Sequence, residues 1–163
     1  MLTSEELRKQ AIMKAAITQA NVTSSNGIGG PFGAAIVKDG EIICVSNNRV
    51  LKDNDPTAHA EITAIRAACK KLGTYDLSGC ELYATSQPCP MCLSAIIWAN
   101  IKKVYYCNDY ADTEAIGFRD DFIYQYLRMA DPSESDLVTF ERIELPEGKE
   151  LYRKYVENSS VIY

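Results

Sequence analysis

The sequence predicts an α/β fold of three layers, in which helices cover both faces of a mixed five-stranded sheet. The first observation is that strand-like and helix-like segments alternate along the chain, as in an α/β sandwich. The second is the pair Asp39-Gly40 between two apolar runs, a hairpin signal that makes one strand pair antiparallel. The third is the composition, because 163 residues, 47% hydrophobic and 24% charged, suit one domain with a sizeable core. We therefore expect residues 1–163 to form a single domain.

The helices are predicted from capping residues and from apolar residues at helical spacing. Thr3 or Ser4 caps the first helix, and acidic residues follow in its first turn. A second helix is expected to begin at Pro56 and to end at Gly73. The prolines of P-C-P open a third, because proline is accepted in a first helical turn. The expected helices cover residues 3–20, 56–72, 88–100, 122–130 and 147–160.

The strands are predicted from runs of β-branched and aromatic residues that turn residues bound. The hairpin occupies residues 34–48 and supplies two strands. Three further strands are expected, at residues 80–86, 102–108 and 136–145. Together these segments make the five strands of the predicted sheet.

The charge balance excludes some partners. The net charge is −5, whereas a general grip on the phosphate backbone needs many Lys and Arg on one face, so no nucleic-acid partner is expected. The opening MLTSEELRKQ lacks the basic and then apolar pattern of a secretory signal, and no apolar run reaches the ~20 residues of a membrane span. We expect a cytoplasmic protein without a membrane partner. Its six cysteines then stay reduced, and a paired set suggests metal binding or catalysis.

Two distant parts of the chain together form a metal-binding pattern. Cys89 and Cys92 make a C-x-x-C at the start of a predicted helix, where positions i and i+3 share a face and the helix N-terminus favours thiolate. Alone this pair is weak evidence, because redox pairs and core cysteines show the same spacing. His59, the only histidine, is equally weak alone, since such a residue is more often structural. With Glu61, however, it completes H-x-E and P-C-x-x-C, the signature of zinc-dependent deaminases.

The number of ligands separates a catalytic site from a structural one. His59 and the two cysteines supply three ligands, and zinc with three protein ligands keeps a position for water, whereas a structural site closes with four. One of the other four cysteines could supply a fourth ligand, which would make a non-catalytic zinc module. Glu61 differs from His59 by about 200° around the helix, so it is poorly placed as a ligand and available to move a proton. The alternative for Glu61 is a solvated helix carboxylate.

In these motifs the chain resembles the cytidine deaminase-like superfamily and, within it, is similar to bacterial guanine deaminases. The resemblance covers most of the chain. Four blocks carry it: GIGGPFGAAIVKDG, NDPTAHAEITAIRAACKKLG, PCPMCLSAIIWA and AIGFRDDFIY. The first three are shared in part with tRNA adenosine deaminases and cytosine deaminases, and the last favours guanine. The resemblance implies the cytidine deaminase-like variant of the three-layer fold.

The resemblance also implies the reacting groups. One zinc ion per subunit is held by His59, Cys89 and Cys92. Glu61 moves protons between the attacking water, the ring and the departing amine. Asp120 is implied as a second catalytic carboxylate near the purine amino group, although Asp121 leaves this register open by one. Either aspartate is equally plausible as a helix N-cap.

Substrate contacts are implied for Asn48, Phe32, Pro88 and Tyr163. The Asn48 amide can both donate to and accept from a base edge, but it is also an ordinary turn residue. Phe32 could equally be a core aromatic, and the terminal Tyr163 could fray. The family commonly reads E-P-C before the zinc cysteine, and this chain has Gln87 there, which we expect to alter the surroundings of the ion rather than its ligands.

These implications predict a zinc-dependent hydrolase that converts guanine to xanthine and ammonia in purine metabolism. A deaminase of another nucleobase or nucleoside, such as a tRNA adenosine or cytosine deaminase, is the alternative within the class. The alternative from another class is the non-catalytic zinc module. The family pattern further implies a homodimer, in which the C-terminal segment from about residue 130 to residue 163 is exchanged between subunits.

Overall fold

The computed structural model describes residues 1–132, 135–158 and 161–162. The chain divides into two compact units, Met1–Tyr124 and Gln125–Tyr163. The elements that lie wholly in the first unit are α1 (Ser4–Ser25), β1 (Gly33–Lys38), β2 (Glu41–Asn47), α2 (Val50–Asp53), α3 (Ala60–Leu72), β3 (Cys80–Ser86), α4 (Pro90–Trp98), β4 (Lys103–Asn108) and α5 (Tyr110–Ala115). Helix α6 (Asp121–Arg128) spans the boundary, and α7 (Pro146–Asn158) lies in the second unit.

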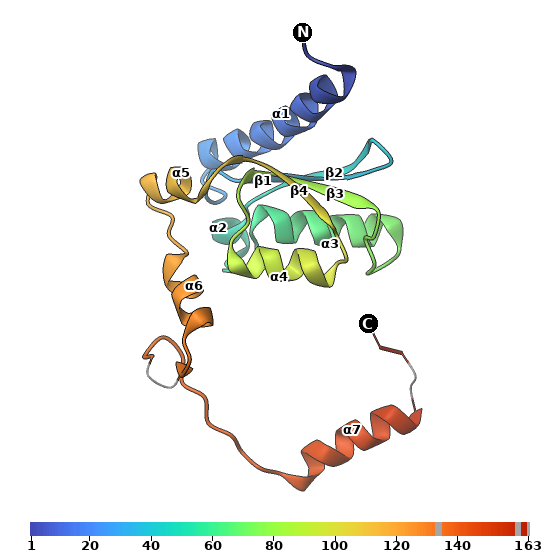
Figure 1. The fold of residues 1–163 in the computed structure, drawn as a ribbon, viewed down its shortest axis with the longest axis vertical. Coiled ribbons are helices and arrows are strands. Elements are labelled where there is room, and N and C mark those ends of the chain that lie inside the picture. Colours follow the sequence, from blue (N-terminus) through green and yellow to red (C-terminus); the bar gives the residue numbers. More distant parts are fainter. Residues whose placement is uncertain (133–134, 159–160, 163) are drawn as a thin grey trace. The chain divides into compact units, whose positions relative to one another are not determined.

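Among the described residues, four strands form one mixed sheet in the order β2-β1-β3-β4 (Figure 1). β1 is antiparallel to both β2 and β3, and β3 is parallel to β4, which confirms the prediction of a mixed sheet. The hairpin between β1 and β2 turns at Asp39 and Gly40, whose φ angles are 50° and 82°. Two positive φ angles are what a type I′ turn requires, so the predicted hairpin signal is confirmed.

The prediction of a fifth strand at residues 136–145 is wrong. These residues belong to the second unit, and in the described part of the chain they join no strand ladder. Their alternating apolar side chains favour an extended backbone. A strand also needs a neighbouring strand whose backbone groups complete the hydrogen-bonded ladder. The sequence pattern indicates an extended backbone but not the presence of that neighbour.

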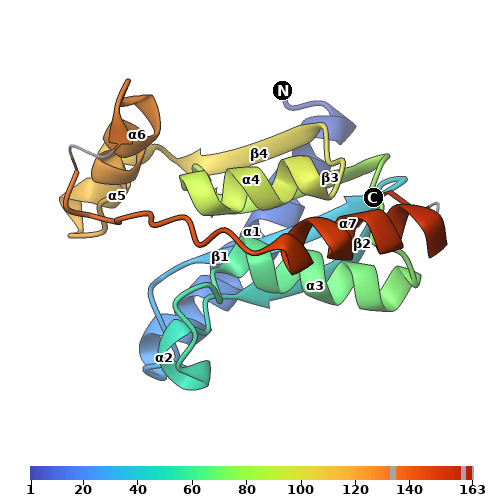
Figure 2. The same cartoon turned by 90° about the horizontal axis from the view of Figure 1, so that it is seen from below.

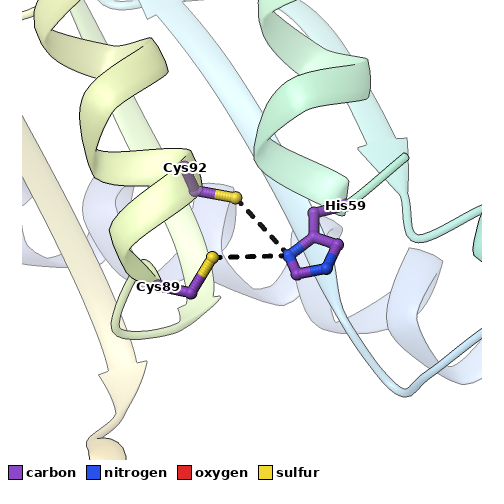
Figure 3. A group of neighbouring side chains, drawn as sticks. All are labelled: His59, Cys89 and Cys92. Atoms are coloured by element: carbon purple, nitrogen blue, oxygen red, sulfur yellow. Dashed lines mark hydrogen bonds between the residues drawn. The ribbon is translucent and has the colours of Figure 1, made fainter. Parts of the chain in front are cut away.

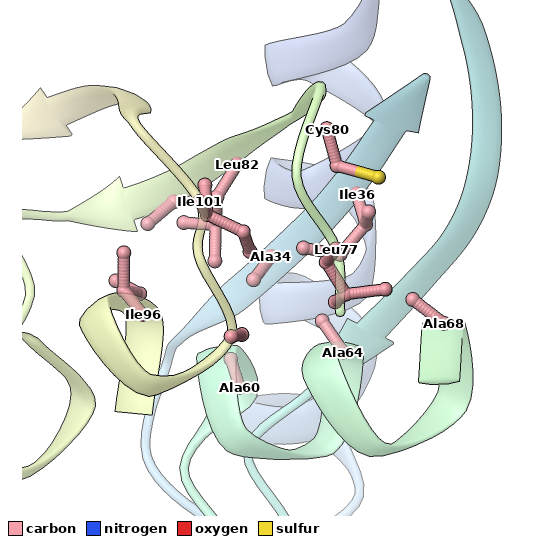
Figure 4. Packing of buried hydrophobic residues seen from close by; sticks show 12 residues of the cluster. Ala34, Ile36, Ala60, Ala64, Ala68, Leu77, Cys80, Leu82, Ile96 and Ile101 are labelled. Carbon is pink, nitrogen blue, oxygen red and sulfur yellow. The ribbon is translucent and has the colours of Figure 1, made fainter. Parts of the chain in front are cut away.

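Helices pack against both faces of the sheet, so the central strand β1 is buried on both sides. Ala34 and Ile36 belong to the core cluster that lies between the sheet and helices α3 and α4 (Figure 4). Ala35 and Val37 belong to a second cluster, where they meet Ile12 of α1. The two views in Figures 1 and 2 show α1 on one face and α3 and α4 side by side on the other. The predicted three-layer arrangement is therefore confirmed for the first unit.

Helix α3 approaches the sheet closely because its innermost residues are small. Ala60, Ala64 and Ala68 recur every four residues, and each side chain is fully buried. Helical spacing predicts a buried stripe of larger residues, Ile62, Ile65, Cys69 and Leu72. Ile62 is buried, but the other three are only half-buried at the edge of the core. The helix also begins later than Pro56, because residues 56–59 form a loop that places His59 at the N-cap.

The second unit consists of the end of α6, an irregular segment and the amphipathic helix α7. Its large apolar side chains are mostly exposed, among them Phe140, Ile143 and Val156. In the ranges that the structure describes, no helix is both long and apolar enough to cross a membrane.

Candidate active site

Two helix N-termini bring the three predicted zinc ligands together. His59 is the N-cap of α3 and Cys89 is the N-cap of α4, each with an extended backbone conformation. Cys92 follows one turn into α4, so both sulfurs share a face of that helix. Figure 3 shows the three side chains converging from the two neighbouring helices. The ligand atoms are His59 Nδ1 and the two cysteine Sγ atoms, which all lie within 4.8 Å of one another.

The spacing of these atoms fits one zinc ion. Each sulfur lies 3.6 Å from His59 Nδ1. A tetrahedral ion with Zn–S of about 2.3 Å and Zn–N of about 2.0 Å would separate nitrogen from sulfur by roughly 3.5 Å. The donor set of one imidazole and two thiolates is also one that zinc prefers. The group therefore fits a single zinc site.

Mutual hydrogen bonding shifts the pKa values of the two thiols in opposite directions. Hydrogen bonds from Cys92 and His59 lower the pKa of Cys89 to about 4, although burial opposes them. The pKa of Cys92 is raised, first because its thiol hydrogen-bonds with Cys89 and then because it is buried. A divalent cation bound between them would hold both sulfurs as thiolates, because a coordinated thiol is deprotonated.

The described residues supply three ligands to this group and no fourth. Cys44, which could have completed a structural site, instead donates from its Sγ to the carbonyl oxygen of Ala64, at 3.3 Å. Cys69 and Cys80 also belong to the core against the sheet. Three protein ligands would leave a zinc ion one coordination position for water, as in catalytic zinc sites.

Glu61 lies beside the ligands inside the protein. Its side chain is only 7% exposed, and it lines the cavity that opens on the metal group. Burial raises the pKa of the Glu61 carboxyl. A carboxyl with a raised pKa exchanges protons more readily near neutral pH, which suits a general acid and base. The alternative of a solvated surface carboxylate does not hold.

The cavity has a volume of about 700 Å³, within the usual range for small-molecule sites. Asn48 lines it and is held on both sides, because its N–H donates to the Phe32 carbonyl at 3.0 Å and its Oδ1 accepts the Val50 N–H at 3.1 Å. Its Nδ2 donates no hydrogen bond to the described residues. Gly29 packs against this amide so closely that a Cβ there would lie 2.1 Å from Asn48 Oδ1.

Aromatic side chains form a wall of the cavity. Phe32 and Phe118 meet edge to face, with ring centroids 5.0 Å apart and an interplanar angle of 85°. The sequence offered two roles for Phe32, a pocket residue or a core aromatic. It has both surroundings, because it lines the cavity and also packs against the main core cluster. Such a wall suits a flat, apolar-faced ligand such as a nucleobase.

The structure separates the two neighbouring aspartates. Asp120 lines the cavity, and burial followed by the charge of Cys89 raises the pKa of its carboxyl. Asp121 instead binds Arg119, with the shorter contact at 2.9 Å. Asp120 is therefore the residue placed toward the metal group. Its carbonyl oxygen also accepts the N–H of Ile123 at 3.0 Å, so Asp120 directly precedes α6, while a side-chain cap by either aspartate stays a prediction.

The remaining residues that the sequence indicated are Pro88, Tyr163 and Gln87. Pro88 is buried and is not among the residues that line the cavity, and its carbonyl oxygen accepts a hydrogen bond from Tyr110. Tyr163 lies outside the described residues. Gln87 lines the cavity but does not belong to the metal group.

Sequence reasoning missed several residues of the cavity. Neither α2 nor α5 was predicted, although both contribute to the lining. The capping box formed by Asp109 and Asp112 at the start of α5 is a signal that could have found this helix. The missed lining residues include Gly29, Leu51, Tyr110, Thr113 and Phe118.

A three-ligand zinc site beside a buried carboxylate, set in an α/β sandwich, defines a zinc-dependent hydrolase. The family model of the cytidine and deoxycytidylate deaminase zinc-binding region matches residues 7–108. The chain belongs to this family.

Known proteins similar to the chain include two kinds of deaminase. The guanine deaminase of Bacillus subtilis is 48% identical over 141 residues, which cover 86% of this chain and 89% of that protein. Its crystal structure superimposes with a TM-score of 0.87 at 44% identity and covers 94% of this chain and 97% of that one. The tRNA-specific adenosine deaminase of Aquifex aeolicus is 46% identical over 98 residues, which cover 60% of this chain and 64% of that protein.

Proposed function

We propose that the protein converts guanine to xanthine and ammonia by hydrolytic deamination. The observation that carries this proposal is the extent of the similarity. By sequence, likeness to the tRNA-specific adenosine deaminase covers 60% of the chain, whereas likeness to the guanine deaminase covers 86%. The longer match takes in the region beyond residue 108, where Asp120 and Phe118 complete the cavity.

The residues of the cavity have separate tasks in this reaction. Asn48, fixed through its backbone N–H and its Oδ1, offers Nδ2 to an acceptor on the base edge. Phe32 and Phe118 contact the flat base and reduce its access to water. Asp120 faces the amino group of guanine and accepts a hydrogen bond from it.

Proton transfer is assigned to Glu61. His59, Cys89 and Cys92 would hold a zinc ion, which would lower the pKa of a bound water to about 7. Glu61 accepts a proton from the water as its oxygen bonds to C2 of guanine, and passes that proton to the ring nitrogen. It then moves the proton of the new C2 hydroxyl group to the amino group, so that the bond between C2 and the amino nitrogen breaks and xanthine and ammonia leave. Its burial supports this assignment, because a buried carboxyl exchanges protons without bulk water intervening.

The alternatives are disfavoured by particular observations. A non-catalytic zinc module would need a fourth ligand and would give the buried Glu61 no task. A tRNA substrate would need cationic side chains around the cavity. Arg119 is the one Lys or Arg among the lining residues that the structure describes, and Asp121 and Glu114 neutralise it.

A substrate panel tests the proposal. Guanine, guanosine, cytosine, cytidine, adenine and tRNA are each incubated with the zinc-loaded protein, and released ammonia is measured. We expect guanine to give the highest kcat/KM by at least about tenfold, because the pocket is built to hydrogen-bond one edge pattern. Faster release from cytidine or from tRNA would contradict the proposal.

We further propose that the protein acts as a homodimer in which the second unit is exchanged between subunits. The support is its exposed apolar surface, since Phe140 is 83% exposed and Ile143 is 79% exposed, and a second copy would cover such side chains. Light scattering during size-exclusion chromatography should give twice the 18.1 kDa mass of the chain. A monomeric mass at micromolar concentration would contradict it.

A cytoplasmic setting is part of the same proposal. All six cysteines are free thiols, and two of them must be thiolates to hold zinc. A reducing compartment preserves both conditions.

A further inference from the structure

The N-termini of α4, α5 and α6 lie beside the cavity, and two tyrosines connect them. Cys89 caps α4, Tyr110 is the first residue of α5, and Asp120 accepts the first backbone hydrogen bonds of α6. The Tyr110 hydroxyl donates to the carbonyl oxygen of Pro88 at 3.1 Å. It also lies 2.5 Å from the Tyr124 hydroxyl in α6.

The direction of these hydrogen bonds follows from the donors available. A carbonyl oxygen only accepts, so the single hydroxyl proton of Tyr110 is used on Pro88. Tyr124 must then donate to Tyr110. The chain of bonds therefore runs from the Tyr124 hydroxyl to the Tyr110 hydroxyl to the Pro88 carbonyl. The two rings also pack edge to face, with centroids 5.5 Å apart.

This series of hydrogen bonds ends beside the zinc ligand Cys89 on one side and near Asp120 on the other. Pro88 is bonded directly to the zinc ligand Cys89, and it is buried, so Tyr110 satisfies an acceptor that water reaches poorly. Tyr124 belongs to the first turn of α6, where its N–H contacts the Asp120 carbonyl oxygen at 3.3 Å. The connection therefore spans from the metal ligand to the second carboxylate of the cavity.

Tyr110 also lines the cavity itself. Its hydroxyl holds the ring in place, because it donates to the Pro88 carbonyl oxygen and accepts from the Tyr124 hydroxyl. Burial and the hydrogen bond with Tyr124 raise the pKa of Tyr110, which keeps the hydroxyl protonated and able to donate.

We propose that Tyr110 is a positioning residue, which acts with Tyr124 to fix the Cys89 segment and the Asp120 carboxylate at one separation across the cavity. This proposal rests on the proposed deamination of guanine. Loss of these hydrogen bonds leaves the zinc ligands and the cavity wall present, but the distance between the Cys89 segment and the Asp120 carboxylate is no longer fixed. Misplacement of that kind lowers the rate of the chemical step more than it lowers binding.

The test uses Tyr110→Phe and Tyr124→Phe in the full-length protein, with Tyr106→Phe as the control. Tyr106 lies on β4 and is half exposed, and its hydroxyl makes no hydrogen bond to the described residues. Both test variants keep the aromatic ring. We expect Tyr110→Phe to lower kcat for guanine about 10- to 100-fold and to change KM less than about twofold. The control should match the parent protein.

A second readout does not depend on turnover. In the cobalt(II)-substituted protein, absorption bands from the cysteine thiolates report the geometry at Cys89. Tyr110→Phe frees the Pro88 carbonyl and should shift these bands. Tyr124→Phe leaves the Tyr110–Pro88 bond in place, so it should lower kcat without shifting them.

Unchanged kcat and unchanged cobalt spectra in Tyr110→Phe would overturn the positioning role. A raised KM with unchanged kcat would also overturn it, because that pattern marks a direct substrate contact. If Tyr110→Phe does not fold, Tyr124→Phe decides by the same kcat criterion. If the parent protein leaves guanine unchanged, the proposed function fails, and the cobalt spectra still decide whether the tyrosines fix the metal ligands.

Discussion

At the scale of single residues, Glu61 shows how position gives an ordinary side chain a chemical role. A carboxylate is rarely buried without a partner, because desolvation of its charge is costly. Glu61 is buried at the first turn of α3, two residues after the ligand His59. Burial and the charge of Cys89 both raise the pKa of the Glu61 carboxyl, which makes proton exchange accessible near neutral pH.

Glu61→Gln keeps the size of the side chain and removes its ability to carry a proton. We expect the zinc content to stay at one per chain and kcat for guanine to fall by about 10²- to 10⁴-fold. Metal analysis and steady-state kinetics measure both quantities. The exposed Glu41→Gln serves as the matched control. A variant that turns over normally would remove Glu61 from the mechanism.

Gly29→Ala should weaken substrate binding through Asn48. The added Cβ would lie 2.1 Å from Asn48 Oδ1, so the amide must leave its place. We expect KM for guanine to rise about tenfold, the equivalent of one hydrogen bond of about 1.4 kcal/mol. Gly148→Ala is the control, because a Cβ there meets nothing within 4 Å. If both variants keep the parental KM, Asn48 does not hold the base.

The sequence was sufficient to predict the metal group but not the whole cavity. His59, Cys89 and Cys92 follow a spacing that their shared chemistry dictates, and the structure brings them together. The choice between Asp120 and Asp121 depends on one helical position, which only the packing of α6 and the Arg119 ion pair decide. Residues that act by shape, such as Gly29, leave no chemical signature in a sequence.

At the scale of elements, helix α3 places the site through its close packing. Alanines at every fourth position let its axis approach the sheet, which brings His59 toward the start of α4. Hydrophobic spacing alone favoured the larger residues as the buried face. The spacing did not indicate Ala60, Ala64 and Ala68, because a buried alanine and an exposed alanine are the same letter in a pattern of apolar residues.

Ala64→Leu tests this packing. Ala64 is fully buried, so the larger side chain must push α3 away from the sheet. Overpacking of this kind is expected to lower the free energy of unfolding by about 1–3 kcal/mol. Urea denaturation followed by circular dichroism measures it, and the exposed Ala11→Leu on α1 is the control. Equal midpoints for the two variants would show that α3 does not need small residues there.

At the scale of the whole molecule, the sequence predicts the layers better than the number of strands. Alternating strands and helices, together with the Asp39-Gly40 turn, are local signals, and the mixed sheet follows from them. The segment 136–145 has the pattern of a strand but joins no strand ladder among the described residues, because pairing needs a neighbouring strand and the segment's own pattern does not supply one.

Removal of zinc should destabilise the whole fold. Without a cation, the two thiols and the imidazole at the starts of α3 and α4 lose their common ligand, and binding energy that favours the native state is lost. At free zinc near 100 times Kd, we expect a difference of about 2.7 kcal/mol between loaded and stripped protein. Thermal melts with zinc and with a chelator measure it. Cys92→Ser should show a much smaller zinc-dependent change, and an identical melting temperature for loaded and stripped parent protein would contradict the site.

The central claim is that water replaces the amino group of guanine at this zinc site. The most direct measurement is incubation of guanine with the zinc-loaded protein in ¹⁸O-labelled water, followed by mass spectrometry of the purine and an assay of ammonia. We predict xanthine that carries one ¹⁸O atom for each ammonia released, and loss of both products with Glu61→Gln. Unchanged guanine, in a preparation that releases ammonia from cytidine or from tRNA, would contradict the claim.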